Sequence, residues 1–249
     1  MADLQDISNE KIRQEIEEFV ENPDELERNV EIFSRVRPLM QEIGAALIEG
    51  DDGTVDKLTK QALDDNVDAL EIMDDGLIAA MGVVGIKFRD NFIFVPEVLA
   101  CARAMKAGMG YIEPILSESG VKPLATVIMG TVKGDLHDIG KNLCIMMLRG
   151  SGFKVVDLGV DTSDDEFIDA VEEHSAPILG MSALLTTTMP NMGKTIEAFI
   201  DADMRDDVQI MVGGAPVTQE FADDMGADAY GKDALDCVSV AKGFLSVQA

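Results

Sequence analysis

The spacing of apolar residues changes character about halfway along the chain. Up to about residue 120, apolar side chains recur every three or four positions, as they do on one face of a helix. This pattern predicts four or five helices joined by short loops, which would pack as a bundle. An additional N-terminal helix is expected over residues 8–21, where Ser8 is a candidate N-cap and Asn22-Pro23 ends the helix.

From residue 124 onward, short apolar runs alternate with helical stretches. The predicted strands are residues 124–132, 154–158, 178–182, 209–212 and 227–230. The predicted helices are residues 139–149, 164–173, 192–202, 219–225 and 234–245. Strands that alternate with helices predict an α/β fold of the Rossmann/flavodoxin-like kind, with a parallel five-stranded sheet and flanking helices.

The expected organisation is therefore a helical bundle, a linker and an α/β domain. The polar stretch with Gly120 and Pro123 separates the two patterns. We place the helical domain at residues 1–118, the linker at 119–123 and the α/β domain at 124–249.

Charge restricts the classes of partner. The 249 residues include 47 acidic and 20 basic side chains, for a net charge of -27. So negative a surface repels phosphate backbones and anionic lipids, which predicts that neither nucleic acid nor a membrane is a partner. The acidic N-terminus lacks the apolar run of a signal peptide, and the three cysteines lie far apart. These features predict a cytoplasmic protein.

A histidine stands on the loop after the first predicted strand. The stretch Gly134-Asp135-Leu136-His137-Asp138-Ile139-Gly140 precedes a predicted helix. Open α/β sheets bind ligands at the carboxyl ends of their strands. A neutral imidazole there can ligate a metal, and a nearby carboxylate can fix its tautomer. Taken alone, so short a pattern also fits a solvated loop histidine.

Two further loops of the predicted sheet carry unusual residues. Ser182, Leu184 and Thr186 follow the third strand, and Gly213-Gly214 follows the fourth. Each has an ordinary explanation, since hydroxyls cap helices and paired glycines form tight turns. Together with the histidine loop, at βαβ spacing along one sheet edge, they predict a groove for a large polar ligand tail.

These motifs resemble those of a known family. Asp135-x-His137-x-x-Gly140, Ser182-x-Leu184 and Gly213-Gly214 resemble the signature of the cobalamin-binding domains of methionine synthase and of corrinoid methyl-carrier proteins. Segments 81–88 and 94–99 resemble the helical cap of those proteins. Ile86 stands where the cap often has Glu, and Asp90-Asn91 where it often has Gly, which leaves the methyl donor open.

The resemblance implies a cobalamin or related corrinoid bound base-off/His-on. His137 would be the lower cobalt ligand in place of the cofactor's own benzimidazole. Asp135 would hydrogen-bond the other ring nitrogen of His137, and Ser182 would extend that relay. The remaining residues implied to contact the cofactor are Gly134, Leu136, Asp138, Ile139, Gly140, Leu184, Thr186, Gly213, Gly214, Tyr230 and Gly231.

On the helical half, Met81, Val84 and Phe88 share a helix face. The resemblance implies that they form an apolar lid over the upper face of the corrin, whereas packing alone would place them in the bundle core. A lid has to move, and residues 120–123 are the candidate hinge; the alternative there is a fixed connector.

The implied function is methyl transfer as a carrier subunit. The protein would carry a methyl group between a substrate-specific methyltransferase and a second methyltransferase serving tetrahydrofolate or coenzyme M, and a reductive activase would be a further partner. A cobalamin-binding sensor is the alternative, although no basic helix-turn-helix appears. A cofactor-free flavodoxin-like domain is a third reading.

Overall fold

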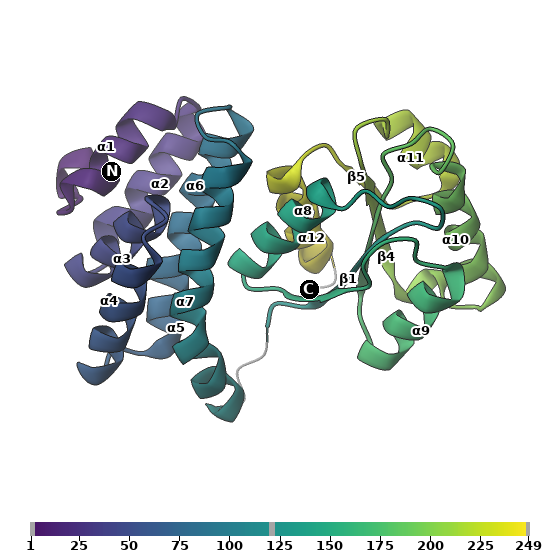
Figure 1. Cartoon of the computed structure of the whole chain (residues 1–249). Helices are drawn as coiled ribbons and strands as arrows, with labels where there is room; N and C mark the ends of the chain where they lie inside the picture. Colours follow the sequence, from purple (N-terminus) through teal and green to yellow (C-terminus); the bar gives the residue numbers. More distant parts are fainter. Residues whose placement is uncertain (1–2, 120–122, 248–249) are drawn as a thin grey trace. The chain divides into compact units, whose positions relative to one another are not determined.

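The chain forms two compact units, residues 1–122 and 123–249, in a computed structural model that describes residues 3–119 and 123–247 (Figure 1). We call them the helical unit and the sheet unit. The first contains only helices, and the second contains a five-stranded parallel sheet with flanking helices. The predicted fold class is confirmed. Most of the predicted linker and hinge, residues 120–122, lies outside the described residues.

In the helical unit a short 3-10 helix and two α-helices precede the rest of the bundle. Its elements are η1 Leu4–Asp6, α1 Glu10–Phe19, α2 Pro23–Arg35, α3 Pro38–Ile48, α4 Asp52–Asp64, α5 Ala69–Glu71, η2 Ile72–Ile78, α6 Ala79–Arg89 and α7 Val95–Ser119. Elements α5, η2 and α6 follow one another without a break, and the middle one, η2, has π-helical hydrogen bonding. Within the described ranges, no helix has the length and apolar character needed to cross a membrane.

A buried glutamine ties the N-terminal segment to α3. Gln41 Oε1 accepts hydrogen bonds from Ser8 Oγ (2.9 Å) and Asn9 N (2.7 Å), and Gln41 Nε2 donates to the carbonyl oxygens of Phe33 (2.8 Å) and Val36 (3.1 Å). The N-cap predicted at Ser8 is wrong by one residue, because Asn9 Oδ1 accepts from Ile12 N at 3.2 Å and α1 starts at Glu10. The Ser8 hydroxyl donates to Gln41 Oε1 instead of capping the helix.

Both N-terminal helices also hold the end of α6. The buried ammonium of Lys87 pairs with Glu15 and lies 4.3 Å from the ring centroid of Phe19, both on α1. Two residues further, the Arg89 guanidinium donates two hydrogen bonds to the Glu25 carboxylate of α2, with Nη1–Oε1 and Nη2–Oε2 distances of 2.6 and 2.9 Å. Charged groups with fixed partners thus fasten α1 and α2 to the bundle.

The sheet unit has strand order β2-β1-β3-β4-β5, with every neighbouring pair parallel. Its strands are β1 Thr126–Thr131, β2 Lys154–Asp157, β3 Ile178–Ser182, β4 Gln209–Gly213 and β5 Ala229–Gly231. The helices are α8 Ile139–Gly150, α9 Asp164–His174, α10 Pro190–Asp201, α11 Gln219–Met225 and α12 Ala234–Val247, with η3 Arg205–Asp207 before β4. Helices α8 and α12 pack together on one face of the sheet, and α9 and α10 on the other (Figure 1).

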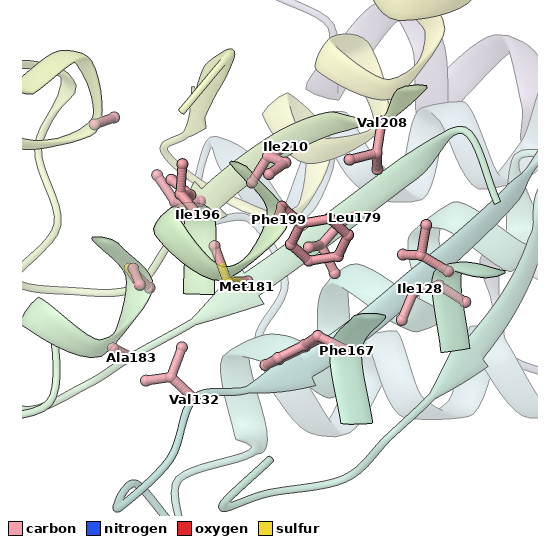
Figure 2. Close-up of a cluster of buried hydrophobic side chains, with 14 of the residues drawn as sticks. Ile128, Val132, Phe167, Leu179, Met181, Ala183, Ile196, Phe199, Val208 and Ile210 are labelled. Carbon is pink, nitrogen blue, oxygen red and sulfur yellow. The ribbon is translucent and has the colours of Figure 1, made fainter. Parts of the chain in front are cut away.

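The core of the sheet unit lies between the sheet and the pair α9 and α10. Figure 2 shows the rings of Phe167 from α9 and Phe199 from α10 among Ile128, Leu179 and other strand residues. Both rings are fully buried, and burial of a side chain of this size stabilises a fold by about 1.5–3 kcal/mol. This packing fixes the carboxyl ends of the strands, where the candidate site lies.

Candidate functional site

The candidate site lies where the strand order reverses. Strands β1 and β3 are neighbours, yet the loop after β1 leads to α8 on one face and the loop after β3 leads to α10 on the other. Ligands of open α/β sheets bind in the crevice at such a switch point. The residues that directly follow the two strands, Val132 and Ala183, lie close together (Figure 2), and Val132 N donates to Ser182 O at 3.1 Å.

The loop after β1, residues 132–138, has a fixed conformation, and we call it the histidine loop. Gly134 has a φ of +83°, a left-handed conformation that favours glycine, and its N–H donates to Asp161 Oδ1 at 2.7 Å. The buried Thr131 hydroxyl donates to the carbonyl oxygen of His137 at 2.9 Å. These contacts set the backbone on both sides of Asp135.

The Asp135 side chain is completely buried and accepts five hydrogen bonds. Its Oδ1 accepts from the backbone N of His137 (3.0 Å) and from His137 Nδ1 (2.7 Å). Its Oδ2 accepts from Leu184 N (2.8 Å), Leu185 N (3.2 Å) and Thr188 Oγ1 (2.7 Å). Donors from the loops after β1 and β3 thus converge on one carboxylate.

These donors keep Asp135 ionised. Burial by itself raises the pKa of a carboxyl group, but the hydrogen bonds from Thr188, Leu184 and His137 outweigh it and hold the pKa of Asp135 well below its ordinary value. An ionised carboxylate only accepts hydrogen bonds, so Nδ1 of His137 carries the proton of the neutral ring. Nε2 then bears the lone pair, and because the side chain is 51% exposed, that nitrogen is open to a ligand.

The hydroxyl that hydrogen-bonds Asp135 in the structure is that of Thr188 and not that of Ser182. Ser182 was expected to hydrogen-bond this carboxylate, but among the described hydrogen bonds none joins the two side chains. The hydroxyl at that place comes from Thr188, which the sequence reasoning missed. The signal was the run of threonines at 186–188, but Thr186 was selected from it, and Thr186 is exposed whereas Thr188 is buried.

Glycines let the neighbouring loops approach each other closely. Gly214 has a φ of +133°, and a Cβ at this position would lie 1.9 Å from the carbonyl oxygen of Ala183. A Cβ on Gly213 would lie 2.9 Å from the carbonyl oxygen of Gly231. Tyr230 and Gly231 are part of β5 and pair with Val212 and Gly213 of β4, which puts them on the same edge of the sheet.

Exposed apolar side chains lie on both loops of the site. Leu136 is 72% and Ile139 69% exposed, and Leu184 and Leu185 at the facing loop are also exposed. We call these four residues the apolar rim. Asp138 stands between the first two as the N-cap residue of α8, and Gly140 follows in the first turn of that helix, where a Cβ would meet no atom within 4 Å. Apolar surface of this kind marks a binding site.

The donor set fits a metal that brings most of its own ligands. Among residues 3–119 and 123–247, no group of three or more His, Cys, Asp or Glu side chains could hold a metal ion. The site offers one imidazole nitrogen with an apolar rim around it. A corrinoid already holds its cobalt and would need from the chain one nitrogen ligand and apolar surface; His137 and the apolar rim could supply both, so a corrinoid fits these residues.

Two of the three predicted lid residues occupy the core of the helical unit. Met81 and Val84 on α6 are buried and pack within the bundle, as the packing alternative expects, and a lid role for them stays a prediction. Helical spacing placed them on one face but did not show that this face points inward. Phe88, near the end of α6, is half-buried, and its role as a lid stays a prediction.

Comparison with known proteins identifies the family. Two family models, each described as a B12 binding domain, match residues 125–239 and 39–113. Trimethylamine corrinoid protein 2 of Methanosarcina mazei is 44% identical over 204 residues, which is 81% of this chain and 94% of that protein. The dimethylamine corrinoid protein of Methanosarcina barkeri is 40% identical over 210 residues, 84% and 98% of the two chains.

Solved structures agree with these relatives. A cobalamin-binding protein from Desulfitobacterium hafniense has a TM-score of 0.71 at 28% identity and covers 84% of this chain and 99% of its own. A chain of the methanol:cobalamin methyltransferase complex MtaBC from Methanosarcina barkeri has a TM-score of 0.74 at 29% identity, with 90% and 93% covered. The protein therefore belongs to the corrinoid proteins, and its cofactor is a cobalamin or related corrinoid.

Proposed function

We propose that this protein carries a methyl group on a corrinoid bound base-off/His-on, with His137 as the lower cobalt ligand. The observation that carries the proposal is the hydrogen bond of 2.7 Å between His137 Nδ1 and the buried, ionised Asp135. This bond leaves Nε2 as the ligating atom, and it lies at the switch point of the sheet. When bound, the corrinoid supplies a cobalt atom that accepts and donates the methyl group.

The residues of the chain bind and orient the cofactor in this proposal. Asp135 holds the imidazole in the ligating tautomer and stabilises the protonated ring whenever His137 leaves the metal. The apolar rim supports the underside of the macrocycle. Gly213 and Gly214 allow close approach of the neighbouring backbone, since a Cβ on either would collide with Gly231 O or Ala183 O, and in this proposal the nucleotide tail lies along this glycine-lined edge.

Phe88 is the residue of the predicted lid that keeps an accessible side chain. We propose that it shields the upper face of the corrin from water and oxidants until a partner enzyme docks.

The partners in this proposal are two methyltransferases. Relatives of the chain are named for trimethylamine and dimethylamine, and one structural relative belongs to a methanol:cobalamin methyltransferase complex. We infer a substrate-specific methyltransferase for a methylamine or methanol on the donor side. On the acceptor side we place a second methyltransferase serving tetrahydrofolate or coenzyme M, with a reductive activase, all in the cytoplasm.

Reconstitution with hydroxocobalamin tests the ligand assignment. We expect a red protein with about one corrinoid per chain, because the chain has one histidine loop. In the cobalt(II) form, electron paramagnetic resonance is expected to show coupling to one imidazole nitrogen, and His137→Ala to remove it. His174→Ala is the matched control, since the chain contains only these two histidines. Coupling that persists in His137→Ala would remove the lower-ligand assignment.

Methyl labelling separates a carrier from a sensor. Extract of the native host is supplied with methyl-labelled trimethylamine, dimethylamine or methanol, and the bound cofactor is then analysed. A carrier is expected to acquire the label from at least one donor. A loaded protein that acquires none of the three labels contradicts the carrier role.

A further inference from the structure

The corner between α6 and α7, residues 87–94, contains Phe88 and makes a tight turn. Asn91 has a φ of +64°, a left-handed conformation that asparagine tolerates. Two backbone hydrogen bonds close the turn, since Phe92 N donates to Lys87 O at 2.8 Å and Asn91 N donates to Phe88 O at 3.2 Å. An exposed turn with so few bonds opens easily unless side chains hold it. The place of Phe88 therefore depends on the side chains that contact this corner.

Phe19 on α1 contacts both residues that close the turn. Its ring centroid lies 4.3 Å from Lys87 Nζ. The ring also meets that of Phe92 edge to face, with centroids 5.1 Å apart and an angle of 62° between the planes. Cation–π and edge-to-face contacts are both attractive, so the ring holds Lys87 and Phe92 together from outside the turn.

Glu25 on α2 holds the residue that follows Phe88. The Arg89 guanidinium donates two hydrogen bonds to the Glu25 carboxylate, and it also donates to Asp90 Oδ1 at 2.8 Å and Oδ2 at 2.7 Å. A planar guanidinium with two carboxylate partners has little freedom left, which fixes the last turn of α6. Phe88 thus stands between two residues, Lys87 and Arg89, that are each bound to an N-terminal helix.

The N-terminal helices lie outside the part of the chain that defines the family. Both α1 and α2 precede residue 39, where the first matched B12 binding domain begins. A lid residue must be fixed while it covers a cofactor and must move when a partner enzyme docks. Contacts that hold the corner set how often it opens, so α1 and α2 are placed to control this motion.

We propose that Phe19 and Glu25 are positioning residues that brace the α6–α7 corner and so hold Phe88 where it covers the corrin. The inference rests on the proposed function of Phe88 as a lid. Its first test needs no cofactor, so the brace and the lid are tested separately.

The first test is amide hydrogen exchange of the cofactor-free full chain, measured residue by residue by nuclear magnetic resonance. The N–H groups of Asn91 and Phe92 report opening of the corner. In Phe19→Leu the ring contacts are lost, and these two amides are expected to exchange about tenfold faster. The N–H of Asp65, which donates to Gln61 O at the end of α4, is the comparison and is expected to exchange at its original rate. Equal acceleration at Asp65 would mean a general loss of stability and would overturn the proposal.

Matched variants separate the brace from a general effect of mutation. Phe19→Tyr keeps the ring and is expected to leave the exchange of the corner unaltered. Glu25→Gln weakens the grip on Arg89 and should accelerate exchange at the corner by about threefold. Glu31→Gln, on the same helix, removes only an exposed pair with Arg35 and should change nothing at the corner.

Each of these results decides the role of one residue. Unaltered exchange at the corner in Phe19→Leu or in Glu25→Gln removes that residue from the brace. The same acceleration in Glu31→Gln as in Glu25→Gln overturns the assignment of Glu25.

The loaded protein gives the second readout, the rate at which cobalt(I) is oxidised in air. Phe19→Leu and Phe88→Ala are each expected to raise this rate, because the upper face of the corrin is less well covered. The double variant is expected to be no faster than Phe88→Ala alone, since the brace acts through the Phe88 ring.

Two outcomes would separate the brace from the lid. Single effects that multiply in the double variant, or an unaltered rate in Phe19→Leu beside a raised one in Phe88→Ala, overturn the link between Phe19 and the lid. If Phe88→Ala leaves the rate unaltered, the lid proposal fails, and the cofactor-free exchange still decides whether Phe19 and Glu25 brace the corner.

Discussion

The ammonium group of Lys87 lies 4.3 Å from the ring centroid of Phe19 and pairs with Glu15, so α6 and α1 share a buried cation. Glu15→Gln leaves that cation without a counter-charge. We expect the helical unit to lose about 2–3 kcal/mol of unfolding free energy, towards the lower end for a buried pair because Glu15 is partly exposed. Urea unfolding followed by circular dichroism measures it.

Glu31→Gln is the matched control for this prediction. Glu31 pairs with Arg35 on the exposed surface of α2, and loss of such a pair is expected to cost less than about 0.5 kcal/mol. Equal losses of unfolding free energy in the two variants would show that the Lys87–Glu15 pair stabilises the fold no more than the exposed pair does.

Gly214 and Gly140 are expected to respond differently to alanine. At Gly214 a Cβ would lie 1.9 Å from Ala183 O, and the positive φ adds strain, so Gly214→Ala should destabilise the sheet unit by about 3 kcal/mol or more. At Gly140, in a helix with open space around it, Gly140→Ala should leave stability within about 1 kcal/mol of the original. Thermal unfolding of the cofactor-free protein distinguishes the two.

Gly140→Ala also tests the cofactor contact. If Gly140 lies against the corrinoid, the added methyl group should weaken hydroxocobalamin binding, measured by absorbance titration, while the fold stays intact. Unchanged binding would remove Gly140 from the site.

The apolar rim gives a prediction about binding without a change in stability. Leu136 is 72% exposed, so Leu136→Asn removes almost no buried surface and should not lower the melting temperature. It should weaken corrinoid binding by about tenfold, as expected when a side chain no longer packs on the ring. Ile200→Asn is the control. Ile200 is 57% exposed and lies near the C-terminal end of α10, whereas the candidate site lies at the loop before the N-terminal end of this helix. A matching loss of affinity in both variants would contradict the rim.

Asp135 predicts how stability depends on pH. Folding lowers the pKa of Asp135 below its reference value of 3.8, so the stability that its ionised form contributes is fully present above that value. It is lost as the pH falls through the lower pKa of the folded state. Asp135→Asn should remove this part of the acid dependence and, by setting an amide against three donors on Oδ2, cost about 2–3 kcal/mol at neutral pH.

Acid unfolding of the cofactor-free protein checks this prediction. Asp161→Asn is the comparison, because the pKa of Asp161 is also lowered, chiefly by the Gly134 N–H, but its side chain is exposed. An Asp135→Asn protein with the acid profile of the unaltered chain would show that Asp135 is already protonated in the fold.

Periodicity predicted the order of helices and strands because each buries a regular face. The third strand and the helix Gln219–Met225 agree with the predicted ranges, whereas β1 is shorter by three residues. Leu124 is apolar but exposed, and Val132 has left the ladder to start the histidine loop. Apolarity alone does not mark where hydrogen bonding to the neighbouring strand ends.

The parts of the site that sequence missed depend on loop conformation. Thr186, Thr187 and Thr188 are chemically alike, and only the turn that hydrogen-bonds Thr188 N to Leu185 O brings the third hydroxyl to Asp135. Likewise, a shared helix face does not tell whether Met81 and Val84 point inward or outward. The pairing of Asp135 with His137 was predictable because two residues along one loop leave few other arrangements.

Five donors around the Asp135 carboxylate have a consequence for loading the protein. The imidazole is immobilised before the cofactor arrives, so its rotational freedom, worth about 1 kcal/mol for a side chain of this kind, is given up during folding and not during capture of the vitamin. In a chain whose histidine side chain rotated freely, the same entropy would be lost when the cofactor binds. In the proposed base-off/His-on state, the exchange of benzimidazole for imidazole would therefore be easier, because the side chain of His137 already has its orientation.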